Sequence, residues 1–249
     1  MCYSATASFT GSGVIAVIGI ATLGHVREPR TLLFAAMPLL FSIHQFVEGL
    51  VWLGLNGQIG KLALDHVAFM FTMYAQGLLP VLMPLAVTLM EPRGRRREVM
   101  VGLTAIGAVA AAWDAIGLIS LPLNTCVQGH SIAYINQMTA SLPISVLYIL
   151  AACGTLLLST HRVIRWYGAL NIIALSITQI VKAYAFASVW CFYAAIMSTM
   201  IYWQFQRGTI DIATPNGRSR ILQPLLLPWL HWQRRRGGGD RPPAPAPPL

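Results

Sequence analysis

Long apolar runs separated by short polar connections dominate the chain. A run of about 20 apolar residues is long enough to cross the hydrocarbon core of a bilayer as a helix. Runs of this length suit helices, because the strands of a membrane barrel are only about 10 residues long and alternate in polarity. The pattern predicts an all-α polytopic membrane protein, a single bundle of seven transmembrane helices at about residues 8–23, 32–55, 67–89, 99–121, 142–158, 163–184 and 189–205.

Composition supports a membrane protein and charge sets its orientation. Only 10% of the residues are charged and 56% are hydrophobic, whereas soluble domains carry about 25% charged residues. All of the 17 lysines and arginines except Lys61 and Lys182 follow the first, third and fifth runs or lie in the tail. The positive-inside rule then predicts an outside N-terminus and a cytoplasmic C-terminus, in a multi-pass protein of the cell membrane.

The net charge of +9 is explained by this topology, and no basic fold remains to bind nucleic acid. The first run has no positive charge before it, which argues against a cleaved signal peptide. We expect acidic lipid head groups as partners of the two arginine clusters on the cytoplasmic side. These clusters are Arg93, Arg95, Arg96 and Arg97, and Arg234, Arg235 and Arg236.

The chain divides into three parts. Residues 1–206 form the predicted transmembrane domain. Residues 207–236 combine a polar stretch, an apolar interfacial stretch and the second arginine cluster, which is typical of a segment lying on the cytoplasmic leaflet. Residues 237–249 are mostly glycine and proline, and we expect this tail to be disordered.

Ionisable side chains interrupt the apolar runs. His44, Gln45 and Glu48 lie in the second run, with His44 and Glu48 on one helical face, and Asp114 lies in the fourth. A charge at the centre of a lipid-facing helix costs about 2.5–3.5 kcal/mol, so both carboxylates should face protein. A rise of about 1.5 Å per residue puts both about 6–8 Å outside the midplane. We therefore predict a polar pocket in the outer half of the bundle, which also receives Gln179 and Lys182.

The connection over residues 122–141 is long enough to cover this pocket. Its Cys126, His130 and Tyr134 are four residues apart, a spacing that would align them on one face of a short helix. Cys126 also lies near the outer face with Cys2 and Cys191, and a disulfide between two of these three cysteines can persist outside the cytoplasm.

Three functions fit the polar residues. His44 and Glu48 can reach one metal ion, and Asp114, His66 or His130 could complete a zinc site, which would make a membrane-embedded hydrolase. Glu48 and Asp114, with His44 and Lys182, could instead form a proton relay in a transporter or channel. In the third hypothesis these side chains hydrogen-bond one another in a structural, sensing or ligand-binding protein, and the ligand would be a small molecule or a lipid.

Several stretches together are similar to a known family. They are Met1-Cys2-Tyr3-Ser4-Ala5-Thr6-Ala7-Ser8-Phe9, His44-Gln45 with Glu48-Gly49, Glu91-Pro92, and Ser188-Val189-Trp190-Cys191-Phe192. The chain resembles, over about residues 1–206, an uncharacterised family of bacterial integral membrane proteins that opens Met-Cys-Phe-Ser-Ala-Thr-Ala-Ser. Tyr3 departs from that opening. The resemblance implies a multi-helix membrane fold and supplies no reaction, because the family has no assigned function.

Overall fold

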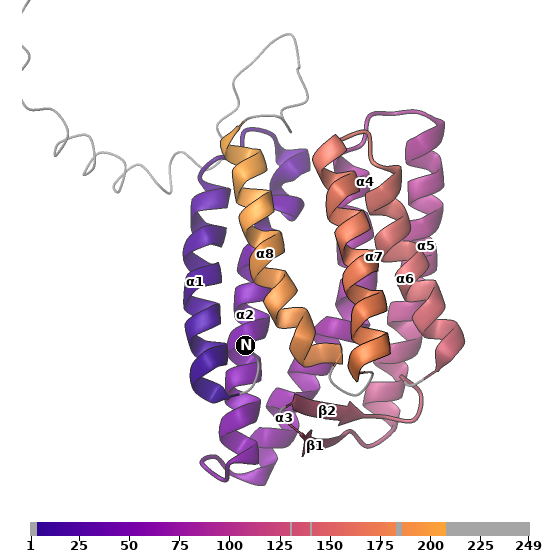
Figure 1. The fold of residues 1–249 in the computed structure, drawn as a ribbon. Helices are drawn as coiled ribbons and strands as arrows, with labels where there is room; N and C mark the ends of the chain where they lie inside the picture. The colour runs from indigo at the N-terminus through magenta and orange to yellow at the C-terminus, as the bar shows by residue number, and fades with distance from the viewer. Residues whose placement is uncertain (1–3, 130, 140, 183–185, 208–249) are drawn as a thin grey trace, which may run out of the picture.

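The computed structural model describes residues 4–129, 131–139, 141–182 and 186–207, and their side chains except those of residues 176–193 (Figure 1). The described residues form a bundle of long helices with a small β-hairpin at one end (Figure 1). The two predicted segments after residue 207 lie outside this part of the chain. The helices are α1 (Ala5–Leu23), η1 (Pro29–Thr31), α2 (Leu32–Leu55), α3 (Lys61–Thr72), η2 (Met73–Leu78), α4 (Leu79–Met90), α5 (Arg95–Ser120), α6 (Leu142–Leu158), α7 (Arg162–Lys182) and α8 (Phe186–Gln206).

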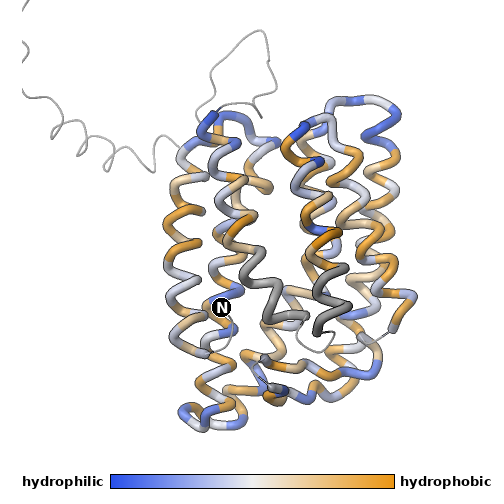
Figure 2. The backbone as a smooth tube through the Cα atoms, viewed as in Figure 1, coloured by the Kyte–Doolittle hydropathy of each residue, from blue (hydrophilic) through white to orange (hydrophobic). Residues whose placement is uncertain are grey.

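The helices agree closely with the predicted apolar runs. Within the described residues, four helical stretches are long and apolar enough to cross a membrane, and α6 is a shorter apolar helix. The third stretch, Lys61–Met90, is continuous from α3 through η2 to α4. Apolar residues cover the length of the bundle and polar residues gather at its two ends (Figure 2). Many large apolar side chains point outward, among them Val14, Val17, Val109, Ile116 and Ile119, as expected of surfaces in contact with lipid.

Helices α1 and α2 pack closely through small residues and a pair of reciprocal hydrogen bonds. The Ser12 hydroxyl donates to the Ser42 carbonyl at 2.9 Å, and the Ser42 hydroxyl donates to the Ser12 carbonyl at 2.9 Å. A Cβ on Gly19 would lie 2.7 Å from the Leu39 backbone nitrogen, so only glycine permits this approach. The Ser4 hydroxyl accepts a hydrogen bond from the Ala7 amide and caps α1, as its sequence position indicates.

Two prolines disturb the long third stretch. Pro84 has no N–H to donate to the Pro80 carbonyl four residues earlier. Gly107 of α5 lies against this carbonyl, since a Cβ there would be only 2.1 Å from the Pro80 oxygen. The absence of a side chain at Gly107 therefore lets α5 pack directly on the backbone of α4.

A buried carboxylate joins elements at the end of the bundle opposite the hairpin. Glu91, at the end of α4, is buried and accepts hydrogen bonds from the Thr160 amide at 3.0 Å and the Ser159 hydroxyl at 3.3 Å. The Thr160 hydroxyl also donates to it. Arg165 donates to the Ser159 carbonyl at 3.0 Å. Glu91 thus holds the turn between α6 and α7 against α4.

Candidate functional site

A cavity of about 370 Å³ lies within the bundle, a volume in the range of small-molecule sites. Its walls come from α2, α3, η2, α4, α5, α6, α7 and α8, and the hairpin forms part of its boundary. Most lining side chains are apolar or aromatic. The polar and tyrosine side chains lining it are His44, Gln45, Thr72, Tyr74, Gln76, Asp114, Gln128, Tyr134, Thr139, Ser145, Tyr148, Tyr167 and Asn171.

On the α2 side, His44 belongs to a stack of aromatic rings. Its imidazole lies 4.0 Å from the Phe71 ring, nearly parallel to it, and 4.7 Å from the Tyr74 ring. Phe71 stacks in turn on Tyr134 of the hairpin at 4.6 Å. The His44 Nδ1 atom is buried with no hydrogen-bond partner among the described residues. This stack connects α2, α3, η2 and the hairpin along one side of the cavity.

Glu48 lies behind the cavity wall. Its side chain is fully buried, with 0% exposed, which confirms that it does not face lipid. Gln45, which lines the cavity, donates from Nε2 to Glu48 Oε2 at 3.0 Å. Glu48 itself is not among the lining residues. Asp114 and Gln45 line the cavity, and Glu48 is connected to it through the hydrogen bond from Gln45, so the predicted meeting of Glu48 and Asp114 in one pocket stays a prediction.

The π-helical segment η2 brings Tyr74, Ala75 and Gln76 to the wall of the cavity. The Leu79 amide donates to the Tyr74 carbonyl, five residues earlier. In this register the Ala75 carbonyl would need the amide of Pro80, which has no hydrogen. The Tyr148 hydroxyl of α6 donates to the Ala75 oxygen at 3.2 Å and satisfies it. Gln76 also lines the cavity. Such π-helical segments are frequent at functional sites.

Asp114 of α5 supplies the carboxylate of the cavity. It is 4% exposed, so it faces protein as the sequence predicts, and its Oδ1 atom has no hydrogen-bond partner within the described part of the chain. Gly107, Ala110 and Ala111, on the preceding turns, are also buried. Small residues at these positions let α5 approach its neighbours and set the carboxylate at the cavity wall.

The connection after α5 is a β-hairpin, so the prediction of a short helix with aligned Cys126, His130 and Tyr134 is wrong. Strands β1 (Asn124–Gln128) and β2 (Ser131–Ile135) pair antiparallel. Gly129, with φ of 62°, begins the tight turn, a role that favours glycine. Cys126 pairs with Ala133, and Tyr134 pairs with Thr125, so Cys126 and Tyr134 point to opposite faces of the hairpin.

The hairpin is fixed to the bundle and covers the cavity, as the sequence predicts for this connection. Ile132, Ala133 and Tyr134 line the cavity. The buried Asn136 side chain donates to the Gly117 carbonyl at 3.1 Å and accepts from the Met138 amide at 3.0 Å. The Asn136 side-chain amide therefore connects the end of the hairpin to the end of α5 that carries Asp114.

The remaining residues of the predicted site fall into two groups: those whose side chains the structure describes, and those whose side chains lie outside the described residues. Cys126 is exposed with a free thiol. His66 is also exposed, and its Nδ1 atom lies 2.6 Å from the Leu62 carbonyl oxygen on its own helix. Cys2 and His130 lie outside the described residues, as do the side chains of Gln179, Lys182 and Cys191. The sequence predicts a disulfide within the set Cys2, Cys126 and Cys191 without choosing the pair, and it stays a prediction.

A metal site does not form among the side chains that the structure describes. No group of three or more histidine, cysteine, aspartate and glutamate side chains there is arranged to hold an ion. His44 packs in an aromatic stack and His66 is exposed on α3. The donor set proposed for zinc, His44, Glu48, His66, Asp114 and His130, is therefore not assembled by the residues that are described, and we derive no chemistry from it.

Four aromatic residues of the cavity escape prediction by polarity alone. Tyr74, Tyr148 and Tyr167 lie in apolar runs, where tyrosine is an ordinary constituent, and Phe71 is wholly apolar. The signal available in the sequence is the pair Pro80 and Pro84, which follows Gln76 and predicts an irregular helix beside a pocket. In the structure this irregularity is the π-helical segment that carries Tyr74 and Gln76.

Replacing Tyr148 by Phe tests the bond to η2. We expect Tyr148→Phe to lower the free energy of unfolding by about 0.6–1.5 kcal/mol, because the Ala75 carbonyl loses its donor. The measurement is unfolding of the full chain in detergent by titration with dodecyl sulfate. Tyr202→Phe is the control, because the Tyr202 ring packs edge-on against His25 and this contact survives, so the change should stay within about 0.5 kcal/mol. Equal effects of the two substitutions would contradict this role of the hydroxyl.

The fold and the cavity define a class of protein: a bundle of apolar helices, with four among the described residues long enough to cross a membrane, around a cavity lined by apolar, aromatic and a few polar side chains. The chain belongs to the family of unknown function DUF6629, whose model matches residues 1–216. The predicted membership of an uncharacterised family is thereby confirmed. No curated protein and no solved structure matches the chain.

Proposed function

We propose that the chain is a multi-pass protein of the cell membrane with seven transmembrane helices that binds a small molecule in the cavity beneath the hairpin. The single observation that carries the proposal is the cavity itself, about 370 Å³ with Asp114, Gln76 and Tyr74 on its walls. A chamber of this size with a few convergent polar groups among aromatic walls is typical of a ligand site.

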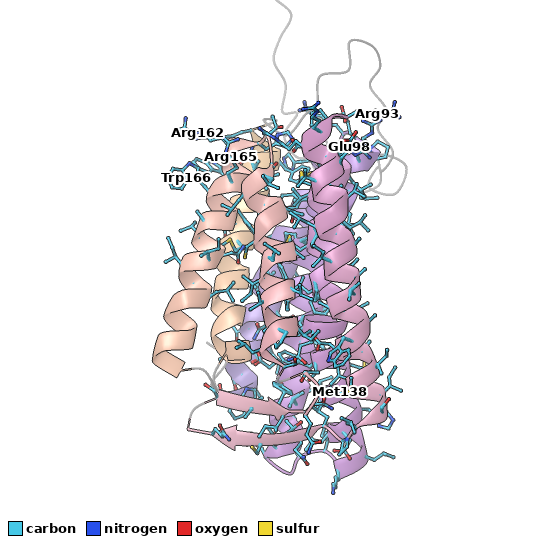
Figure 3. All side chains as sticks on the ribbon, turned by 90° about the vertical axis from the view of Figure 1, so that its right-hand side faces the viewer. Arg93, Glu98, Met138, Arg162, Arg165 and Trp166 are labelled. Atoms are coloured by element: carbon cyan, nitrogen blue, oxygen red, sulfur yellow. The ribbon has the colours of Figure 1, made fainter. Side chains whose placement is uncertain are left out.

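The arrangement of charge supports an orientation with the hairpin outside and the opposite end in the cytoplasm. Arg93, Arg162 and Arg165 lie at the end opposite the hairpin, with Trp166 beside them (Figure 3). Trp203 and Trp166 are exposed, and Arg207 lies 3.8 Å over the Trp203 ring. Tryptophan is typical of both membrane interfaces, and an excess of arginine is typical of the cytoplasmic side. Acidic lipid head groups are the partners that this end would take.

Unpaired polar atoms favour ligand binding over a purely structural role. In the structural hypothesis the polar side chains would satisfy one another, since buried polar groups are nearly always hydrogen-bonded. Asp114 Oδ1, Gln76 Oε1 and the Tyr74 hydroxyl are buried with no partner among the described residues, and all three residues line the cavity. A bound molecule would supply the missing partners.

Filling the cavity tests the proposal. Ala152 of α6 lines the cavity, whereas Leu150 of the same helix is exposed and does not line it. Three probes of one shape, 2-phenylethylamine, 2-phenylethanol and 3-phenylpropanoate, are offered at millimolar concentration to the detergent-purified full chain in equilibrium dialysis. We expect the wild type and Leu150→Trp to retain at least one probe near one equivalent, and Ala152→Trp to retain none above empty micelles.

The outcome against the proposal is equally definite. If the wild type and Ala152→Trp retain the same small amount of all three probes, the retention belongs to the micelle and the cavity is no binding site for such molecules. Size-exclusion chromatography of each variant shows that the protein compared is folded and monodisperse.

A further inference from the structure

We propose that the cavity selects an organic ammonium ion, a protonated or quaternary amine with an apolar or aromatic body. The inference rests on the proposed function, because it names the class of molecule that the same cavity takes. The polar atoms on its walls, the aromatic rings around them and the balance of charge each support this class.

The first argument is the kind of polar atom left without a partner. Asp114 Oδ1 and Gln76 Oε1 are both hydrogen-bond acceptors, and neither has a partner in the described part of the chain. An acceptor is satisfied only by a donor. A ligand that completes this site therefore brings N–H or O–H groups, and an ammonium group supplies several donors together with the charge that complements a carboxylate.

The second argument is the tyrosine side chains on the cavity walls. Tyr74, Tyr148 and Tyr167 line the cavity together with Asp114. Tyrosine and phenylalanine faces attract a cation through the ring quadrupole, more strongly when the cation is desolvated. Cages of aromatic rings are the usual receptors for quaternary ammonium groups.

The third argument is charge. Among the lining residues, Asp114 is the one carboxylate, and no lysine or arginine is found there within the described side chains. A carboxylate ligand would meet Asp114 without a compensating cation, which is strongly unfavourable in a low-dielectric chamber. A neutral ligand would leave the negative charge of Asp114 buried and unpaired. Of these three classes of ligand, only the ammonium ion brings a charge that complements the ionised carboxylate.

The test compares the three probes, which share a phenyl group and differ in charge. We expect the wild type to bind 2-phenylethylamine at least 10-fold more tightly than 2-phenylethanol, and 3-phenylpropanoate more weakly still, by titration calorimetry at neutral pH. Asp114→Asn should weaken the amine about 100-fold, since it breaks a buried charge pair, and should leave the alcohol within about 3-fold of its wild-type affinity.

The outcomes separate this inference from the proposed function. If all probes fail to bind, both are contradicted. If the alcohol or the carboxylate binds as tightly as the amine, the cavity is a binding site and only the choice of an ammonium ion is overturned. The same holds if Asp114→Asn binds the amine as well as the wild type does. Because the comparison of probes on the wild type needs no variant, misfolding of Asp114→Asn leaves the inference testable.

Discussion

Gly107→Ala lowers the free energy of unfolding by about 2–3 kcal/mol, an effect set by overlap with backbone that cannot move aside. The added Cβ would lie 2.1 Å from the Pro80 carbonyl oxygen and 3.1 Å from the Ala151 Cβ. The overlap outweighs the gain of about 0.8–1 kcal/mol that alanine brings over glycine in a helix. To relieve it, α5 has to move away from α4, and Asp114 moves with it.

Gly102→Ala is the matched control on the same helix. A Cβ at Gly102 meets nothing within 4 Å, so only the helix-propensity term remains, and we expect no loss of stability. Both variants are measured by unfolding of the full chain in dodecyl sulfate, and 2-phenylethylamine binding shows whether the cavity persists. Equal stability of the two variants would mean that close contact between α4 and α5 does not hold the bundle.

Glu91→Gln lowers the free energy of unfolding by about 2 kcal/mol, because hydrogen bonds to a buried carboxylate, which are about twice as strong as neutral ones, are replaced by bonds to an amide. The Thr160 amide, the Thr160 hydroxyl and the Ser159 hydroxyl all donate to this carboxylate. A glutamine can keep its oxygen against the Thr160 amide and turn its N–H₂ toward a hydroxyl that then accepts, so the loss comes from exchanging charge-assisted hydrogen bonds for neutral ones. We expect the turn between α6 and α7 to separate from α4 first, which limited proteolysis of inside-out vesicles would detect as cleavage near Arg162.

Glu98→Gln is the control for this substitution. Glu98 lies at the same end of the bundle in the first turn of α5 and is exposed (Figure 3), and changes at such positions stay within about 0.5 kcal/mol. If Glu91→Gln is as stable as Glu98→Gln and no more sensitive to protease, the hydrogen bonds of Glu91 do not hold the turn.

The fold could be predicted from apolar run length because lipid imposes that length on every spanning helix. The second and fifth predicted runs coincide with α2 and α6 at both ends. The hairpin could not be inferred from the four-residue spacing of Cys126, His130 and Tyr134, because three positions fit helix and strand equally well. The alternating β-branched residues Thr125 and Val127, followed by Gly129, give the better signal.

The candidate site could be predicted only in part. Burial of Glu48 and Asp114 follows from the cost of a charge in lipid, and the structure has both buried. Which of them faces the cavity depends on the neighbours of each helix. His44 and Glu48 differ by about 40° around the helix axis, and His44 lines the cavity whereas Glu48 is not among the lining residues. Only the three-dimensional packing of the helices shows that Tyr74, Tyr148 and Tyr167 line the cavity.

The order in which the walls of the cavity enter the membrane follows from its lining. Helices α2, α4, α5 and α6 contribute His44, Met83, Asp114 and Tyr148, whereas Tyr167, Asn171, Ala194 and Met197 come from the last two helices. If the chain enters a membrane as proposed, the first six helices carry Asp114 before the last part of the cavity wall is made. A chain that ends before α7 and α8 would then lack Tyr167, Asn171, Ala194 and Met197 from that wall, and we expect such a product to be degraded faster than the full chain.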